Sequence, residues 1–140
     1  MEEKNSNMTN ATTTSSRLTL LLCPLSERDG GRVQAVLTAL RRSGVQARLL
    51  DEVLELQQPY RWLSEGRVRW ALRRAAQVVL LPRPDGAIGA GTLRDLRLAE
   101  AAELPIAVVR QDGRLLPLAK AGLVDEPKPT QVTAARFTWR

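Results

Sequence analysis

Apolar runs and amphipathic stretches alternate along the middle of the chain, and this alternation predicts strands and helices in turn. Residues 18–23 form an apolar run that ends at Pro24, which is typical of a central strand buried on both faces. Shorter apolar runs over residues 45–50, 77–81 and 105–109 predict further strands. These segments are expected to form the sheet at the centre of the fold.

Amphipathic helices are predicted between these strands. Apolar residues recur at helical spacing from Val33 to Leu40, and Ser43-Gly44 follows as a helix stop. A second helix is expected over residues 61–76 and a third over residues 93–103. Since strands and helices alternate at these lengths, right-handed crossovers and a parallel sheet follow. The predicted fold class is a small doubly wound, Rossmann- or flavodoxin-like α/β fold, with a parallel sheet of four to five strands and helices on both faces.

The two ends of the chain depart from this alternation. Residues 1–17 are rich in Asn, Thr and Ser and carry too little apolar surface to order themselves, so a disordered tail is expected. The Rossmann-like domain is assigned to residues 18–124. Residues 125–140 are assigned to a C-terminal extension, in which residues 131–139 are expected to form a fifth strand at the edge of the sheet.

Composition limits the chemistry that this chain can perform. Its 140 residues, 44% of them apolar, suit one domain with a real core. The single cysteine and the absence of histidine exclude a disulfide framework, a Cys/His zinc site and any histidine-dependent nucleophile. Carboxylates are therefore the main candidates for catalysis, and no metal or cofactor is expected. With no apolar run near the roughly 20 residues that span a bilayer, a cytoplasmic protein without membrane association is expected.

The net charge of +6 comes from 21 Lys and Arg against 15 Asp and Glu, and 18 of the 21 are arginines. Because these arginines are spread over every predicted helix, a solvated basic surface is the first interpretation. Trp70, with Arg67, Arg73 and Arg74 at neighbouring helical positions, leaves a nucleic-acid-binding face as an alternative. The same tryptophan also suits local packing or a helix–helix contact in a dimer.

The glycine-rich turn before the third helix is the most informative segment for function. Ligands of open parallel sheets bind outside the carboxyl ends of the strands, where this turn is expected to lie. Gly86, Gly89 and Gly91 let the backbone approach a ligand closely, and Thr92 is a candidate N-cap at a helix end that favours anions. Asp95, in the first turn of that helix, is expected to face the cleft as a candidate catalytic carboxylate. A plain turn, and an acid that complements the helix dipole, are the structural alternatives.

A second candidate wall of the site follows the first strand. The segment from residue 24 to residue 32 also lies at the carboxyl end of a strand and is expected to line the base side of a ligand. The candidate binding residues there are Cys23, Pro24, Leu25, Asp29 and Gly30. Residues 51–60, a predicted loop that contains Pro59, form a third segment at the same edge of the sheet.

Several of these residues resemble the nucleoside 2-deoxyribosyltransferase-like family of N-glycoside hydrolases and transferases. The resemblance is carried by Gly91-Thr92-Leu93-Arg94-Asp95-Leu96, by the strand from Val78 to Pro82 before it, and by Leu104-Pro105-Ile106 after it. Cys23-Pro24-Leu25 is similar to the Gly-Pro and apolar residue that end the first strand in relatives. The turn at Gly91-Thr92-Leu93 also resembles, more weakly, that of the cytokinin-activating phosphoribohydrolase family.

The resemblance implies a nucleotide or nucleoside as the small-molecule partner, and a homo-oligomer. It places Asp95 at the position of the family's catalytic glutamate, one methylene shorter, acting at the anomeric carbon of the sugar. The first functional hypothesis is therefore cleavage or transfer at an N-glycosidic bond. A non-catalytic nucleotide- or partner-binding module of the same fold is the second hypothesis, and basic nucleic-acid binding is the third.

Overall fold

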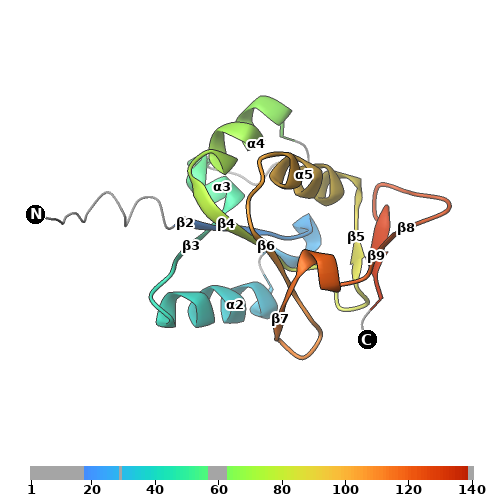
Figure 1. The fold of residues 1–140 in the computed structure, drawn as a ribbon, viewed down its shortest axis with the longest axis horizontal. Helices are drawn as coiled ribbons and strands as arrows, with labels where there is room; N and C mark the ends of the chain where they lie inside the picture. Colours follow the sequence, from blue (N-terminus) through green and yellow to red (C-terminus); the bar gives the residue numbers. More distant parts are fainter. Residues whose placement is uncertain (1–17, 29, 57–62, 139–140) are drawn as a thin grey trace, which may run out of the picture.

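The computed structural model describes residues 18–28, 30–56 and 63–138, which contain a five-stranded sheet of order β3-β2-β4-β6-β7 (Figure 1). Its parallel strands are β2 (Leu18–Leu22), β3 (Gln46–Leu49), β4 (Ala75–Leu80) and β6 (Ile106–Val109). The strand β7 (Leu115–Pro117) runs antiparallel to β6 and closes one edge. Counted along the chain, this order is 2-1-3-4-5, the flavodoxin-like order of a doubly wound fold. The predicted fold class is confirmed.

Helices cover both faces of this sheet (Figure 1). The helix α2 (Gly31–Arg42) packs on one face, and α3 (Leu50–Val53), α4 (Glu65–Leu72) and α5 (Ala90–Ala101) pack on the other. Single turns of 3-10 helix, η1 (Leu25–Glu27) and η2 (Leu118–Lys120), follow β2 and β7. Because the helices cover the two faces of the sheet, the connecting segments meet at the carboxyl ends of the parallel strands, at the edge between the two helical layers.

The strand β2 is buried along its whole length because its side chains supply two separate cores. Leu20 and Leu22 belong to the apolar cluster beneath α4 and α5, whereas Leu21 belongs to the cluster beneath α2. This alternation follows from the period of two along a strand. Full burial of a leucine is worth about 1.5–3 kcal/mol, so an apolar strand stabilises both layers at once. The interpretation of residues 18–23 as a strand buried on both faces is confirmed.

The helix α4 is shorter than the helix predicted over residues 61–76. It begins after Ser64, whose side chain caps it, and ends at Leu72. The first two residues of the predicted range lie outside the described part of the chain, and its last two, Ala75 and Ala76, belong to β4. Alanine favours helices locally, but here Ala75 pairs with Leu18 of the neighbouring strand, and this pairing decides the backbone.

The helix α5 begins earlier than predicted. Its N-cap is Gly89 and not Thr92, and the backbone carbonyl of Gly89 accepts a hydrogen bond from the N–H of Leu93 at 3.0 Å. Thr92 therefore lies inside the first turn, so the N-cap prediction is wrong by one turn. The loop predicted over residues 51–60 also changes, because its beginning belongs to α3; its residues 57–60 lie outside the described ranges.

A second sheet, antiparallel and three-stranded, contains β5 (Ala87–Ile88), β8 (Leu123–Asp125) and β9 (Ala135–Phe137) in the order β5-β9-β8. A strand is present within the predicted range 131–139, as β9, but its predicted place at the edge of the parallel sheet is wrong, because β9 pairs on both sides and lies in the middle of a separate sheet. The side chain of Phe137 is buried in the same cluster as α4 and α5. The segment after residue 124 thus contributes to the main core.

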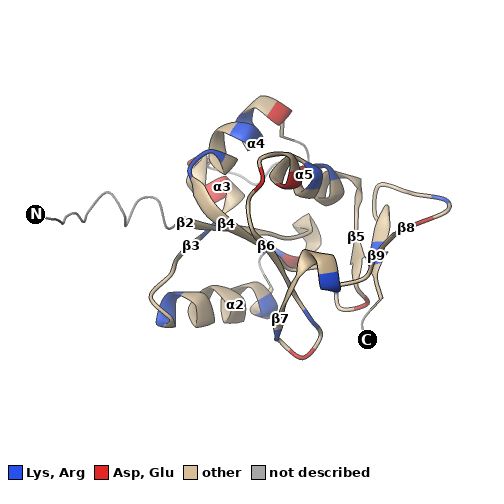
Figure 2. Ribbon diagram, viewed as in Figure 1, with Lys and Arg blue, Asp and Glu red and all other residues tan. Residues whose placement is uncertain are grey.

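Basic residues lie on several elements, including α2, α4 and α5 (Figure 2). They belong to different layers of the fold and not to one helix, as the interpretation of a solvated basic surface expects.

Within the described ranges, no helix combines the length and the apolar character that crossing a membrane requires.

Candidate functional site

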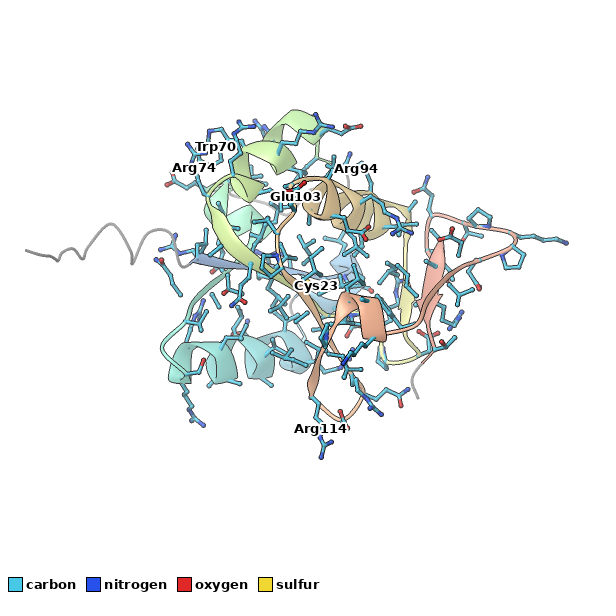
Figure 3. All side chains as sticks on the ribbon, viewed as in Figure 1. Cys23, Trp70, Arg74, Arg94, Glu103 and Arg114 are labelled. Carbon is cyan, nitrogen blue, oxygen red and sulfur yellow. The ribbon has the colours of Figure 1, made fainter. Side chains whose placement is uncertain are left out.

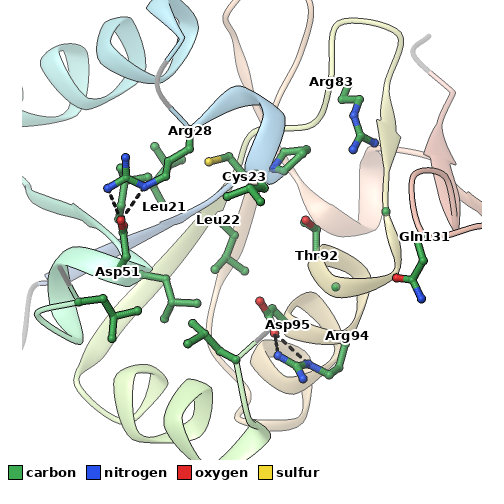
Figure 4. Close-up of a pocket in the computed structure, with 18 residues that line it drawn as sticks. Leu21, Leu22, Cys23, Arg28, Asp51, Arg83, Thr92, Arg94, Asp95 and Gln131 are labelled. Carbon is green, nitrogen blue, oxygen red and sulfur yellow. Dashed lines mark hydrogen bonds and ion pairs between the residues drawn. The ribbon is translucent and has the colours of Figure 1, made fainter. Parts of the chain in front are cut away.

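A pocket of about 200 Å³ lies where β2 and β3 end and α5 begins (Figure 4). The order of the sheet reverses at β2, since β3 lies on one side of it and β4 on the other. Ligands of doubly wound folds bind at such a switch point, outside the carboxyl ends of the strands. The pocket therefore lies where this fold class places a ligand.

The structure brings together most of the residues that the sequence singled out. Those that line the pocket are Asp95, Thr92, Gly91 and Gly89 at the start of α5, and Cys23, Pro24 and Leu25 after β2. Figure 4 shows Asp95 and Thr92 on one side of the pocket and Cys23 on the other. Two segments separated by more than sixty residues of sequence thus form facing walls of one cavity.

Two other predicted residues, Gly86 and Gly30, are not among the described residues that line this pocket. Gly86 has a φ of +86° and makes the turn that precedes β5, where its N–H donates to the carbonyl of Arg83 at 2.8 Å. Gly30 is the N-cap of α2. Asp29 lies outside the described residues. The two described glycines therefore shape the backbone around the site and do not contact its interior.

Gly89 is required by the close approach of another segment and not by its own backbone angles. Its φ of −83° and ψ of −179° are open to any residue. A Cβ atom at this position would lie under 3.0 Å from the carbonyl oxygen of Gln131 and 3.2 Å from that of Val132. The carbonyl of Gln131 also accepts a hydrogen bond from the N–H of Ala90 at 3.2 Å. The segment around Gln131 therefore closes one side of the pocket against the start of α5.

Asp95 is a largely buried carboxylate. Its side chain keeps 15% of its exposure, and its Oδ1 accepts hydrogen bonds from Nε and Nη2 of Arg94 at 3.1 and 2.9 Å. Burial raises the pKa of Asp95 above its ordinary value because desolvation disfavours the charged form, and the adjacent guanidinium of Arg94 opposes this rise. Among the described residues, Oδ2 of Asp95 accepts no hydrogen bond. The group can therefore act toward a ligand as an acid, a base or a nucleophile.

Arg28 and Asp51 are functional candidates that sequence reasoning missed. Nε and Nη2 of Arg28 both contact Oδ2 of Asp51 (Figure 4). Asp51 is 9% exposed and lies in α3, directly after β3. Its position after a strand is a signal in the sequence, but only the helical turn determines which residue of that segment faces the pocket.

Further polar residues of the lining are Arg83, Arg94 and Gln131. Arg83 donates from Nε to the hydroxyl of Ser26 at 3.3 Å and from Nη1 to the carbonyl of Val132, so it ties the segment after β2 to the C-terminal segment. Besides Pro24 and Leu25, the apolar residues of the lining are Leu21, Leu22, Leu49, Leu50, Leu56 and Leu63. Among the described residues, the arginines of this pocket outnumber its aspartates by three to two, and this balance favours an anionic ligand.

Trp70 lies apart from this pocket, at the outer end of α4 (Figure 3). The residue is 39% exposed, and the guanidinium carbon of Arg74 lies 3.4 Å from the centroid of its ring. Arg74 also donates to the backbone carbonyl of Trp70 at 2.9 Å. The arginine therefore covers one face of the ring, which agrees with local packing. The dimer contact and the nucleic-acid face stay predictions.

Comparisons with known proteins identify a fold and no family. No family model matches this chain, and no curated protein matches it. Among solved structures, it is similar to the TIR domains in the structure of the activated Roq1 resistosome directly recognizing the pathogen effector XopQ. The TM-score is 0.51 at 18% sequence identity, over 68% of this chain and 57% of that chain. The chain thus spans little more than half of its structural neighbour, and the likeness shows a shared Rossmann-like fold.

Proposed function

We propose that this protein binds a nucleotide or nucleoside and cleaves or transfers at its N-glycosidic bond, with Asp95 as the catalytic carboxylate. The observation that carries the proposal is the convergence of this buried acid, the glycine-rich start of α5 and the segment after β2 on one pocket. The pocket lies at the switch point of the sheet, where ligands of this fold class bind.

The chemistry assigns Asp95 a role at the anomeric carbon. When the bond from that carbon to the base nitrogen breaks, the electron pair leaves with the base and the carbon becomes oxocarbenium-like. The carboxylate stabilises this positive centre or bonds to it as an ester. Water then attacks the same carbon in a hydrolase, and a second base attacks it in a transferase. In hydrolysis, the proton released by the attacking water balances the proton that the departing base takes up.

The volume of the pocket and the charges of its lining determine which part of the proposed ligand lies inside the pocket and which part lies at its mouth. Pockets for whole ligands commonly have about 300–1,000 Å³. A volume of about 200 Å³ therefore encloses the sugar and part of the base, and a phosphate group extends toward the opening. Arg83 and Arg94 are cationic groups of the lining that could attract such a phosphate. Thr92 and the glycines beside it lie against the sugar.

Membership of the nucleoside 2-deoxyribosyltransferase-like family is part of the same proposal. Its support is the motif from Gly91 to Leu96 in a Rossmann-like fold, with the acid of that motif in the pocket. Asp95 is one methylene shorter than the family's glutamate, so the sugar has to lie closer to α5. The homo-oligomeric state that the resemblance implies is tested by light scattering on the purified chain.

The proposal is tested by incubating the purified full chain with ribo- and deoxyribonucleosides and their monophosphates and measuring free base by chromatography. We expect base release by the wild type and a loss of about 100-fold or more in Asp95→Asn. The matched control is Glu100→Gln, because Glu100 lies on the same helix but is exposed and pairs with Arg97 outside the pocket. Unchanged base release by Asp95→Asn would refute the assignment of the carboxylate.

A non-catalytic binding module of the same fold is the second candidate. It is favoured by Arg94, whose two hydrogen bonds hold one carboxylate oxygen of Asp95 in place. This alternative predicts saturable nucleotide binding that returns the ligand intact. Calorimetric titration with the same nucleotide panel, followed by chromatography of the recovered ligand, separates it from the enzymatic proposal.

A further inference from the structure

Asp51, a largely buried residue in the pocket wall, has one carboxylate oxygen for which the described residues supply no hydrogen-bond donor. Arg28 contacts Oδ2 of Asp51 through both Nε and Nη2. Within the described residues, Oδ1 of Asp51 accepts no hydrogen bond, although the residue is only 9% exposed. Buried polar atoms are nearly always paired, and an unpaired one is costly. An unpaired acceptor in the lining of a pocket therefore indicates a donor on the ligand.

The position of Asp51 selects the part of the ligand that supplies this donor. Figure 4 shows Asp51 and Asp95 in separate parts of the pocket wall, and both line the same cavity. If the anomeric carbon lies at Asp95, the part of the ligand that reaches Asp51 lies on the far side of the glycosidic bond. That part is the base. The leucines of the lining suit the flat apolar faces of a base ring.

We propose that Asp51 recognises the edge of a nucleobase, with its Oδ1 accepting a hydrogen bond from a ring N–H or an exocyclic amine. Arg28 is the positioning residue, because it holds the other oxygen of the carboxylate and so fixes the direction of Oδ1. A site that accepts a hydrogen bond from such a donor rejects an analogue without the donor, since the desolvated acceptor then has no hydrogen-bond partner. The inference rests on the proposed function for the placement of the sugar at Asp95.

The first test changes the ligand and leaves Asp51 intact. Binding is measured by calorimetric titration of the full chain carrying Asp95→Asn, so that the ligand is not consumed. Adenosine monophosphate is compared with purine riboside monophosphate, which lacks the amine, and uridine monophosphate with its 3-methyl derivative, which lacks the ring N–H. For the base that binds better, removal of the donor should weaken binding by about 10-fold or more, as expected for a hydrogen bond to a charged group. Equal affinities within both pairs would overturn the proposal.

The second test changes the carboxylate. In Asp51→Asn the charged acceptor is lost at constant size, so the preference for the donor-bearing ligand should fall about 10-fold while the analogue without the donor keeps its affinity. Equal weakening of both ligands would assign Asp51 a purely structural role through Arg28 and overturn the proposal. Glu27→Gln is the control, because Glu27 lies next to Arg28 in the chain but pairs with Arg32. If Asp51→Asn does not fold, the ligand pairs decide alone.

These measurements separate this inference from the proposed function. Base release without any effect of the N–H donor retains the glycosidase and overturns base recognition by Asp51. Discrimination between the paired ligands without base release supports base recognition and removes the catalytic role of Asp95. A preference for ribo- over deoxyribonucleotides, with no effect of the base donor, would assign Oδ1 of Asp51 to a sugar hydroxyl and overturn the proposal.

Discussion

Replacement of Gly89 by alanine tests how the C-terminal segment holds the pocket together. The added Cβ would lie under 3.0 Å from the carbonyl oxygen of Gln131, a backbone atom that cannot rotate away. The φ and ψ of Gly89 suit alanine, so backbone strain at this residue contributes nothing. The whole penalty therefore arises from a contact between segments about forty residues apart in sequence.

Two contributions set the size of this penalty. Overpacking at a well-packed position costs about 1–3 kcal/mol. Displacement of Gln131 also weakens its 3.2 Å hydrogen bond from Ala90, which is worth about 0.5–1.5 kcal/mol. We therefore expect Gly89→Ala to lower the free energy of unfolding by about 1.5–4.5 kcal/mol. At about 4 °C per kcal/mol for a chain of this length, Tm should fall by about 6–18 °C.

The assay is thermal and urea unfolding followed by circular dichroism, with Gly66→Ala as the matched control. Gly66 lies in α4, and apart from its chain neighbours and the backbone of its own helix, no atom of the described residues lies within 4 Å of a Cβ built there. Because alanine is favoured over glycine in a helix by about 0.5–1 kcal/mol, this control should be as stable as the wild type or more stable. A Gly89→Ala protein as stable as Gly66→Ala would refute the reasoning, since the segment at Gln131 would then not pack on α5.

Two further predictions concern Asp95 and the C-terminal strand. Burial raises the folded-state pKa of Asp95 above its unfolded value near 3.8, so the folded protein holds this proton more strongly than the unfolded chain does. The resulting contribution to the free energy of unfolding is present at low pH and is lost as pH rises through the folded pKa. Asp95→Asn should therefore be more stable than the wild type at about pH 7. Urea unfolding should show that the difference in the free energy of unfolding between the two proteins shrinks toward about pH 4, and a difference that stays constant with pH would contradict this. Phe137→Ala should lose about 3–5 kcal/mol in urea unfolding because the ring is 2% exposed, whereas Val132→Ala, 61% exposed, should change little; equal effects would show that β9 lies outside the core.

The local pattern of the chain was sufficient for much of the site. Apolar runs predicted β2 and β4. The glycine-rich turn after β4 predicted that Asp95 faces a cleft and that Thr92 is a candidate binding residue, and both line the pocket. This worked because the carboxyl ends of parallel strands meet at one edge of a sheet, so residues directly after them converge. Asp51 was not identified as a functional residue, because a single turn of α3 decides which residue of its segment turns inward.

The sequence by itself determined the fold class, because burial of β2 on both faces and the helical spacing of α2 are properties of short segments. Tertiary structure alone decided where residues distant in sequence meet. It converted Ala75 from helix to strand by pairing it with Leu18, and it placed β9 between two partners instead of at an edge. It also made Gly89 obligatory through the backbone at Gln131. Such contacts depend on pairing and packing between segments, for which no single segment carries a periodic signal.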